Sequence, residues 1–219
     1  MFFVSYIYIY VLVITIFEQE LIFMIALVDY GNEKIDSLAE ALNLLNANFT
    51  ITQSESEIIH AEKIIFPGYG DAFNAIKKLH LTNLYSVLRI CNKPMLGVCL
   101  GMQLMADISK EGGKIPCLGL FPVIAEKFDD KIMKVPFIGW SEVETIKESN
   151  LFTGINNRES FYFGNSYYLP ENEYTTSIAI NNIKFSASIE KDNYYAIQFY
   201  PEKSGKSGLQ VLKNFIELC

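Results

Sequence analysis

Histidine and paired cysteine are scarce in this sequence. Its 219 residues include two histidines, His60 and His80, and one tryptophan. No C-x-x-C spacing occurs among the four cysteines, which are Cys91, Cys99, Cys117 and Cys219. A zinc site normally needs four closely spaced cysteine and histidine ligands, so we do not expect one. Scattered cysteines in an acidic chain of this size are typical of a reducing compartment, and we expect a cytoplasmic protein.

Basic residues are outnumbered as well. Lysine and arginine total 18 against 25 acidic residues, which gives a net charge of −7. A surface that binds nucleic acid is normally basic, so we expect no nucleic-acid partner. The 50% hydrophobic and 14% aromatic content excludes a disordered chain. The length allows one domain with a substantial core.

The first 23 residues contain no lysine or arginine. A secretory signal needs a positive start and a small-residue cleavage site, and both are missing. A membrane anchor is a second interpretation, but the apolar stretch from Phe2 to Phe17 is shorter than the roughly 20 residues that span a bilayer. We favour a third, that residues 1–23 are an extension or a misassigned start outside the fold. We therefore expect the functional domain to be residues 24–219, without membrane attachment.

The order of hydrophobic segments indicates an α/β protein. Short apolar strands are expected at Ile25–Val28, Lys63–Phe66 and Pro94–Val98, with helical patterns between them at 35–45, 71–79 and 83–90. Strands alternating with helices predict a parallel sheet that is covered on both faces. The second half is rich in strands, expected at 118–128, 142–146, 160–168, 177–180, 184–189 and 194–199, and a helix is expected at 207–218.

The most informative segment is Gly97-Val98-Cys99-Leu100-Gly101. It has the form G-x-nucleophile-x-G, with a strand entering and a helix, expected from Leu100 to about Ser109, leaving. We expect the helix N-terminus to favour the Cys99 thiolate, and the Leu100 N–H to be an oxyanion donor. The alternative is a buried structural cysteine between two packing glycines.

A second loop, Pro67-Gly68-Tyr69-Gly70, also follows a strand. Open parallel sheets place their ligands at the carboxyl ends of the strands, so both loops are expected to face one crevice. Gly70 would then supply the second oxyanion N–H. The alternative is a plain turn. The loop is not a phosphate-binding loop, because no Gly-Lys-Ser/Thr follows it.

These residues resemble a known family. The stretch from Gly97 to Leu104 is similar to the nucleophile elbow of class I glutamine amidotransferases, above all the glutaminase subunit of imidazole glycerol phosphate synthase. Four further segments match in order, namely 64–70, 135–140, 162–167 and 198–204. The resemblance runs from Met24 to the C-terminus. It implies a flavodoxin-like fold with a central, mostly parallel sheet, helices on both faces and a β-rich second half.

The resemblance also implies a Cys-His-Glu triad. Cys99 would attack the side-chain amide of glutamine to form a glutamyl thioester, and Glu202 would orient the histidine that acts as general base and acid. Gln103 and the stretch Asn165-Ser166-Tyr167 would hold the glutamine. No metal, nucleotide or redox cofactor is implied.

The implied partner is a β/α-barrel cyclase in a heterodimer. The glutaminase subunit would pass ammonia to this partner. Docking would use the edge that carries Cys99, where Tyr69 or Trp140 would contribute exposed aromatic surface.

The chain departs from the family at the histidines. Tyr200 stands two residues before Glu202, where the family has the catalytic histidine, and Phe137 and Asn165 also stand where histidine is usual. A phenol with a pKa near 10 is a poor base, and loss of a positioned base typically costs about 10²–10⁴-fold in rate. His60 and His80 are expected roughly 20 Å and roughly 14 Å from the crevice.

Three functions remain open at this point. The first is a glutaminase subunit for histidine biosynthesis, weakened by Tyr200 or dependent on its partner. The second is a catalytically degenerate binding or regulatory subunit on the same fold. The third is an ammonia-supplying subunit of a surface-sugar amidation pathway.

Overall fold

The computed structural model describes residues 24–31 and 35–219. The hydrophobic segment 1–23, interpreted above as an extension, a signal or an anchor, lies outside the described residues. Within the described part of the chain, no helix is both long and apolar enough to cross a membrane.

One nine-stranded sheet runs through the molecule, in the order β2-β1-β3-β4-β13-β12-β11-β8-β9. Its first five strands are parallel and the remaining pairs are antiparallel. In chain order the strands are β1 (Ile25–Val28), β2 (Phe49–Thr52), β3 (Lys63–Gly68), β4 (Met95–Cys99), β8 (Phe137–Thr145), β9 (Glu159–Asn165), β11 (Thr175–Asn181), β12 (Ile183–Lys191) and β13 (Tyr194–Ile197).

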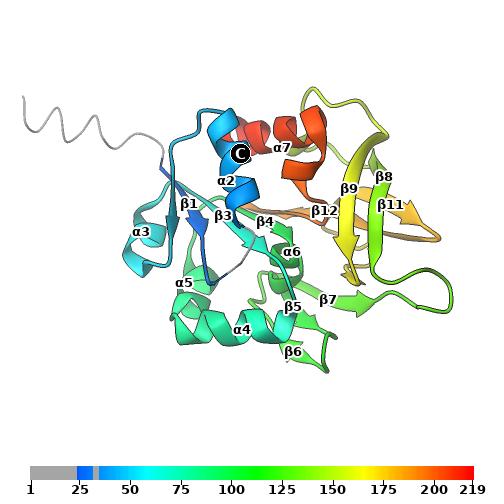
Figure 1. Cartoon of the computed structure of the whole chain (residues 1–219), viewed down its shortest axis with the longest axis horizontal. Helices are drawn as coiled ribbons and strands as arrows, with labels where there is room; N and C mark the ends of the chain where they lie inside the picture. Colours follow the sequence, from blue (N-terminus) through cyan, green and yellow to red (C-terminus); the bar gives the residue numbers. More distant parts are fainter. Residues whose placement is uncertain (1–23, 32–34) are drawn as a thin grey trace, which may run out of the picture.

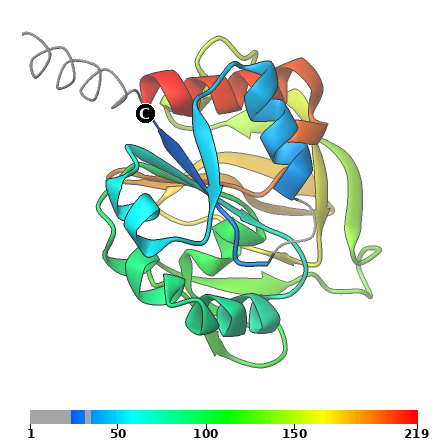
Figure 2. The ribbon, with the colours of Figure 1, turned by 60° about the vertical axis from the view of Figure 1, so that its left-hand side comes forward.

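Helices cover both faces of the parallel half (Figures 1 and 2). On one face lie α2 (Ile35–Leu44) and the C-terminal α7 (Gly205–Leu218), and on the other lie α3 (Glu55–His60), α4 (Ala72–Leu81), α5 (Leu84–Ile90) and α6 (Leu100–Leu104). Two short 3₁₀ turns, η1 (Asn150–Phe152) and η2 (Pro201–Lys203), complete the elements around α7. The predicted fold class is therefore confirmed, including the β-rich second half.

Alternation along β1 explains the two covered faces. Ile25 and Leu27 belong to the core under α2 and α7, whereas Ala26 and Val28 belong to the core under α3, α4 and α5. Successive side chains of a strand point to opposite faces, so a run of four apolar residues is buried on both sides. This is the reason that the run could be recognised from the sequence.

A second, four-stranded sheet follows α6, in the order β10-β7-β5-β6. The helix predicted to run from Leu100 to about Ser109 ends at Leu104, so that part of the prediction is wrong. The carbonyl oxygens of Leu104, Met105 and Ala106 accept backbone hydrogen bonds from the 118–121 segment instead of continuing the helix. The strands of this sheet are β5 (Ala106–Ser109), β6 (Ile115–Pro116), β7 (Phe121–Lys127) and β10 (Tyr167–Tyr168).

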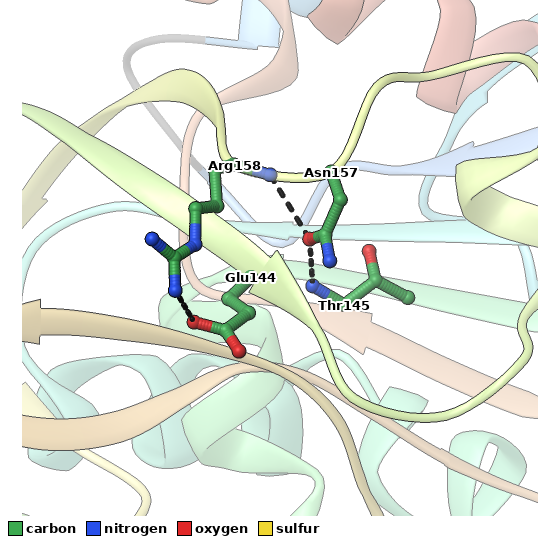
Figure 3. A network of polar contacts seen from close by, with 4 residues as sticks. All are labelled: Glu144, Thr145, Asn157 and Arg158. Atoms are coloured by element: carbon green, nitrogen blue, oxygen red, sulfur yellow. Dashed lines mark hydrogen bonds and ion pairs between the residues drawn. The ribbon is translucent and has the colours of Figure 1, made fainter.

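Polar contacts close the connection between β8 and β9 (Figure 3). The Asn157 side-chain oxygen accepts hydrogen bonds from the backbone N–H groups of Thr145 (2.8 Å) and Arg158 (2.9 Å), and the Arg158 guanidinium pairs with Glu144 at 3.2 Å. The ion pair is exposed and adds little stability. Asn157 fixes the loop, because it satisfies two backbone donors at once.

Close backbone packing joins β3 to the start of α6. A Cβ atom placed on Gly101 would lie 2.0 Å from the carbonyl oxygen of Phe66, and one placed on Gly68 would lie 2.5 Å from the Gly101 nitrogen. Only glycine fits at such a distance. The ends of β3 and β4 are therefore held together without any intervening side chain.

Gly101→Ala should lower the free energy of unfolding by about 3 kcal/mol or more, because its methyl group would overlap a backbone carbonyl that cannot move alone. Gly154→Ala is the control: its φ is +76°, and no atom of the described residues lies within 4 Å of the new Cβ, so strain alone should cost about 1–2 kcal/mol. Urea unfolding of both variants measures the difference. Equal losses would contradict the close-packing argument.

Candidate active site

Cys99 lies at the last position of β4, directly before α6. Its backbone has φ 55° and ψ −109°, and only 4% of the residue is exposed. A positive φ is strained for a residue with a side chain. A strained strand-to-helix turn is the geometry that presents a nucleophile at the head of a sheet, so the structure favours the nucleophile interpretation over that of a plain structural cysteine.

The sulfur of Cys99 has neutral hydrogen-bonding neighbours. The Tyr200 hydroxyl and the Leu100 N–H are hydrogen bonded to it, and the Gln198 amide nitrogen lies 3.7 Å away. Burial nevertheless raises the pKa of the thiol to about 11, assisted by the negative charge of Glu202. The Leu100 N–H at the start of α6 lowers the pKa of the thiol, in the direction expected for a helix N-terminus, but burial has the larger effect. α6 has five residues, and desolvation outweighs its effect.

A cavity of about 110 Å³ opens beside the sulfur. It gathers eight of the nine site residues predicted from the sequence, which are Gly70, Cys99, Leu100, Gln103, Asn165, Ser166, Tyr167 and Tyr200. Gly68, Tyr69, Glu111 and Gly164 complete its lining. Glu202 is the predicted site residue that does not line it. The Cys99 turn and the loop of residues 67–70, called the Gly-rich loop below, both line this cavity. The expectation that they face one crevice is confirmed.

Two buried amides, those of Gln103 and Asn165, line the cavity. The side-chain nitrogens of Gln103 and Asn165 both donate to the carbonyl oxygen of Tyr167, at 2.8 and 2.9 Å. Gln103 also donates to Gln198 at 3.2 Å, which links it to the amide beside Cys99. The Asn165 side-chain oxygen is buried and has no hydrogen-bond partner among the described residues.

Two tyrosines occupy the space between Cys99 and Glu202. The rings of Tyr69 and Tyr200 are stacked, with centroids 5.3 Å apart and planes 7° apart. The Tyr69 hydroxyl donates to Glu202 Oε1 at 2.5 Å, while the Tyr200 hydroxyl is bonded to Cys99 and lies 3.4 Å from the Gly164 carbonyl oxygen. The structure thus forms two separate pairs, Cys99 with Tyr200 and Glu202 with Tyr69.

The second oxygen of Glu202 lacks a donor. Glu202 Oε2 is buried, with no hydrogen-bond partner among the described residues. Burial raises the pKa of this carboxyl group above its usual range, against the opposing effect of the Tyr69 hydrogen bond. A buried acceptor without a donor is costly.

Sequence reasoning missed Glu111 and Gln198. The Glu111 carboxylate lines the cavity and accepts a hydrogen bond from the Ala72 N–H at 2.6 Å, and burial raises its pKa. It lies in a polar turn that carries no motif. Gln198 lies within a segment used for the resemblance, but only the burial of its amide beside the sulfur reveals a contact with the site.

Neither histidine enters the cavity. His60 is exposed, and its Nδ1 lies 2.7 Å from the Ser56 carbonyl oxygen, while the exposed His80 stacks on Tyr85 with ring centroids 4.1 Å apart. The expectation that both lie outside the crevice is confirmed. Among the described residues, no group of histidine, cysteine, aspartate and glutamate side chains could hold a metal ion.

Comparison with known proteins gives one consistent family. The family described as "Glutamine amidotransferase class-I" matches residues 26–218. The chain is 39% identical over 194 residues to the imidazole glycerol phosphate synthase subunit HisH of Buchnera aphidicola, covering 89% of this chain and 99% of that protein. It is 38% identical over 193 residues to HisH of Haemophilus influenzae, with 88% and 96% covered.

Solved structures agree at the level of the fold. One described as a glutamine amidotransferase superposes with a TM-score of 0.69 at 16% identity, covering 88% of this chain and 97% of that one. PurLQS from Thermotoga maritima gives a TM-score of 0.65 at 15% identity, with the same shares covered.

The raised thiol pKa predicts how the reactivity of Cys99 depends on pH. With a pKa of about 11, only about one thiol in 10⁴ is ionised at pH 7, and the thiolate fraction grows about tenfold per pH unit. The rate of Cys99 alkylation by iodoacetamide, followed by peptide mass spectrometry, should therefore keep rising between pH 7 and about pH 10. A rate that levels off below pH 8 would contradict the neutral thiol.

Proposed function

Because the chain belongs to the class I glutamine amidotransferase family, we propose that it is the glutamine-hydrolysing subunit of an imidazole glycerol phosphate synthase, which supplies ammonia in histidine biosynthesis. Residues 24–219 form the amidotransferase domain in this proposal, and the place of action is the cytoplasm. The observation that carries it is the strained Cys99 elbow at the mouth of a cavity that also gathers Gln103 and the 165–167 segment.

Substrate binding would use both charge and amide groups. The Glu111 carboxylate is the acidic group of the cavity lining, and it suits the α-ammonium group of a free amino acid. The unpartnered Asn165 side-chain oxygen suits an N–H donor of the substrate. A cavity with these groups fits a small, polar, zwitterionic ligand such as glutamine.

The reaction would begin at the Cys99 sulfur. The sulfur forms a bond to the side-chain carbonyl carbon of glutamine, the C–N bond breaks, and the nitrogen leaves as ammonia after it has received a proton that balances the one lost by the thiol. Water then hydrolyses the thioester to glutamate. The N–H groups of Leu100 and Gly70 would donate hydrogen bonds to the carbonyl oxygen and stabilise the negative charge that develops on it. Both residues line the cavity beside the sulfur.

Tyr200 limits this reaction. Burial and the neighbouring Cys99 raise its phenol pKa above its usual value, so it stays protonated at neutral pH. A protonated phenol can give a proton to the leaving nitrogen, but it cannot take the proton from the thiol. Slow hydrolysis of glutamine is therefore expected. The neutral thiol also favours a second candidate function, which is a subunit that binds its partner without hydrolysing glutamine.

The partner in this proposal is a β/α-barrel cyclase that docks beside the cavity. Phe137 pairs with Asn165 of the cavity lining, so the start of β8 lies at the cavity rim. Trp140 and Ile138 on this strand are 56% and 64% exposed. Tyr69, expected as a second docking aromatic, is instead half-buried against Tyr200.

Restoring histidine at position 200 should raise glutamine hydrolysis. In complex with its synthase partner, the natural chain is expected to hydrolyse glutamine at least about 100-fold more slowly than a normal subunit. Tyr200→His should raise that rate about 10²-fold or more, because Glu202 Oε2 can accept a hydrogen bond from the imidazole N–H. Glutamate production by the complex is the measurement.

Two control variants accompany this assay. Tyr200→Phe should bring no gain, and Cys99→Ala should abolish hydrolysis. Hydrolysis by the natural chain at a normal rate, lost in Cys99→Ala, would refute the impairment. Failure of Tyr200→His to hydrolyse glutamine would favour the binding subunit.

Trp140→Ala should weaken the complex with the cyclase partner by tenfold or more, because exposed tryptophans at an interface often carry much of its binding energy. Ile90→Ala is the matched control, since Ile90 is 78% exposed but lies at the end of α5, at the other end of the parallel strands. Titration calorimetry measures both dissociation constants. Equal constants for the two variants would rule out this docking surface.

A further inference from the structure

Glu202 is bonded to the Gly-rich loop rather than to the residue at position 200. We propose that Glu202 is a positioning residue for the Gly68–Gly70 loop and acts through the Tyr69 hydroxyl, an inference that rests on the proposed glutaminase function. The hydrogen bond of 2.5 Å between Tyr69 and Glu202 Oε1 and the stacking of Tyr69 on Tyr200 carry it.

The sheet brings these residues together from separate strands. β3 and β13 lie on either side of β4, and both run parallel to it. Tyr69 follows β3, while Tyr200 and Glu202 follow β13, so they meet over Cys99 at the end of β4. A contact between Tyr69 and Glu202 therefore spans the nucleophile and ties the two flanking loops to each other.

The charge distribution strengthens this bond. Burial and the negative charge of Glu202 raise the pKa of the Tyr69 phenol, so its hydroxyl remains a donor at every physiological pH. A hydroxyl that donates to a carboxylate forms a short, charge-assisted hydrogen bond, stronger than a neutral one. A further hydrogen bond links Tyr69 to Ser37 of α2.

The loop needs such an anchor at its far end. Gly68 is fixed by close packing against Gly101 and Leu100. Gly70 has a φ of +93°, and among the described residues no atom lies within 4 Å of the position that a Cβ would take, so none of their side chains packs on that side of it. The Tyr69 side chain is then what fixes the direction in which the chain leaves Gly68, and with it the N–H of Gly70 beside the cavity.

The expected role is oxyanion positioning. A preorganised donor stabilises the charge that develops on the carbonyl oxygen, and removal of one such donor typically costs about 10²–10³-fold in rate. Loosening the loop should cost less, about tenfold, because the N–H remains present but is less well oriented. Binding of the substrate in its ground state should hardly change.

The test uses a chloroketone analogue of glutamine and the full chain in complex with its synthase partner. In the labelling reaction the Cys99 sulfur bonds to the chloromethyl carbon, chloride leaves and the thiol proton passes to solvent, while loop donors assist at the ketone oxygen. Tyr69→Phe and Glu202→Gln should each lower the maximal labelling rate about tenfold. The inhibitor concentration at half-maximal rate should change less than twofold.

The double variant should be no slower than the slower single variant, because both changes break the same bond. Tyr85→Phe and Glu190→Gln are matched controls. The Tyr85 hydroxyl donates to the Cys117 carbonyl oxygen at 2.8 Å, and the half-buried Glu190 accepts from Ser149, and neither residue lines the cavity. These controls should label at the natural rate, and iodoacetamide alkylation of Cys99 should stay within twofold in the controls and in Tyr69→Phe. Because Glu202→Gln removes a negative charge that raises the thiol pKa, its labelling rate is divided by its own iodoacetamide rate before it is compared.

The outcomes distinguish failure of the positioning role from failure of the proposed glutaminase function. A natural chain that labels normally, with Tyr69→Phe unchanged or with additive losses in the double variant, would overturn the positioning role alone. A natural chain whose Cys99 never reacts with the glutamine analogue, although iodoacetamide modifies it, would overturn the proposed glutaminase function and this inference with it.

Discussion

The site depends on the parallel register of β3, β4 and β13. Gly68 is paired with Cys99, and Val98 is paired with Ile197, so three strand ends finish at one level. Backbone contact between Gly101 and Phe66 allows no side chain at this junction, which keeps the Gly-rich loop against the nucleophile turn. The strained φ of Cys99 persists because the surrounding strands and α6 determine it.

Burial governs the chemistry of the site more than any single charge does. Desolvation is the largest cause of the raised pKa values of Cys99, Tyr200 and Glu202. In an enzyme with a histidine between sulfur and carboxylate, a positive imidazolium would offset this cost. Here two neutral phenols fill the space, so the thiol remains protonated, and in the part of the chain that the structure describes one carboxylate oxygen has no donor. The arrangement keeps the glycine-bounded cysteine turn, and no histidine stands between the sulfur and the carboxylate to ionise the thiol.

The sequence located the main parts of the site but not their pairing. Glycines around Cys99 and in the 67–70 loop predicted two turns at one sheet edge, because parallel strands end together. The hydrogen bond from Tyr69 to Glu202 was not foreseeable, since it joins residues 133 positions apart and depends on two side-chain directions. The early end of α6 was missed for a similar reason. Backbone N–H groups of the 118–121 segment, which is not adjacent in the chain, donate hydrogen bonds to the carbonyl groups that a longer helix would use. Glu111 escaped notice because a single acid in a turn has no pattern.

The sequence by itself determined the fold class, the nucleophile turn and the family, because periodic burial and glycine-bounded turns are local properties that short segments express. It also showed that no histidine stands beside Glu202. Only the tertiary structure decided what takes the place of that histidine. Three strands converge at the site, and this convergence stacks Tyr69 on Tyr200 and forms the two hydrogen-bonded pairs, Cys99 with Tyr200 and Glu202 with Tyr69. The raised pKa of the thiol follows from the burial that the convergence creates.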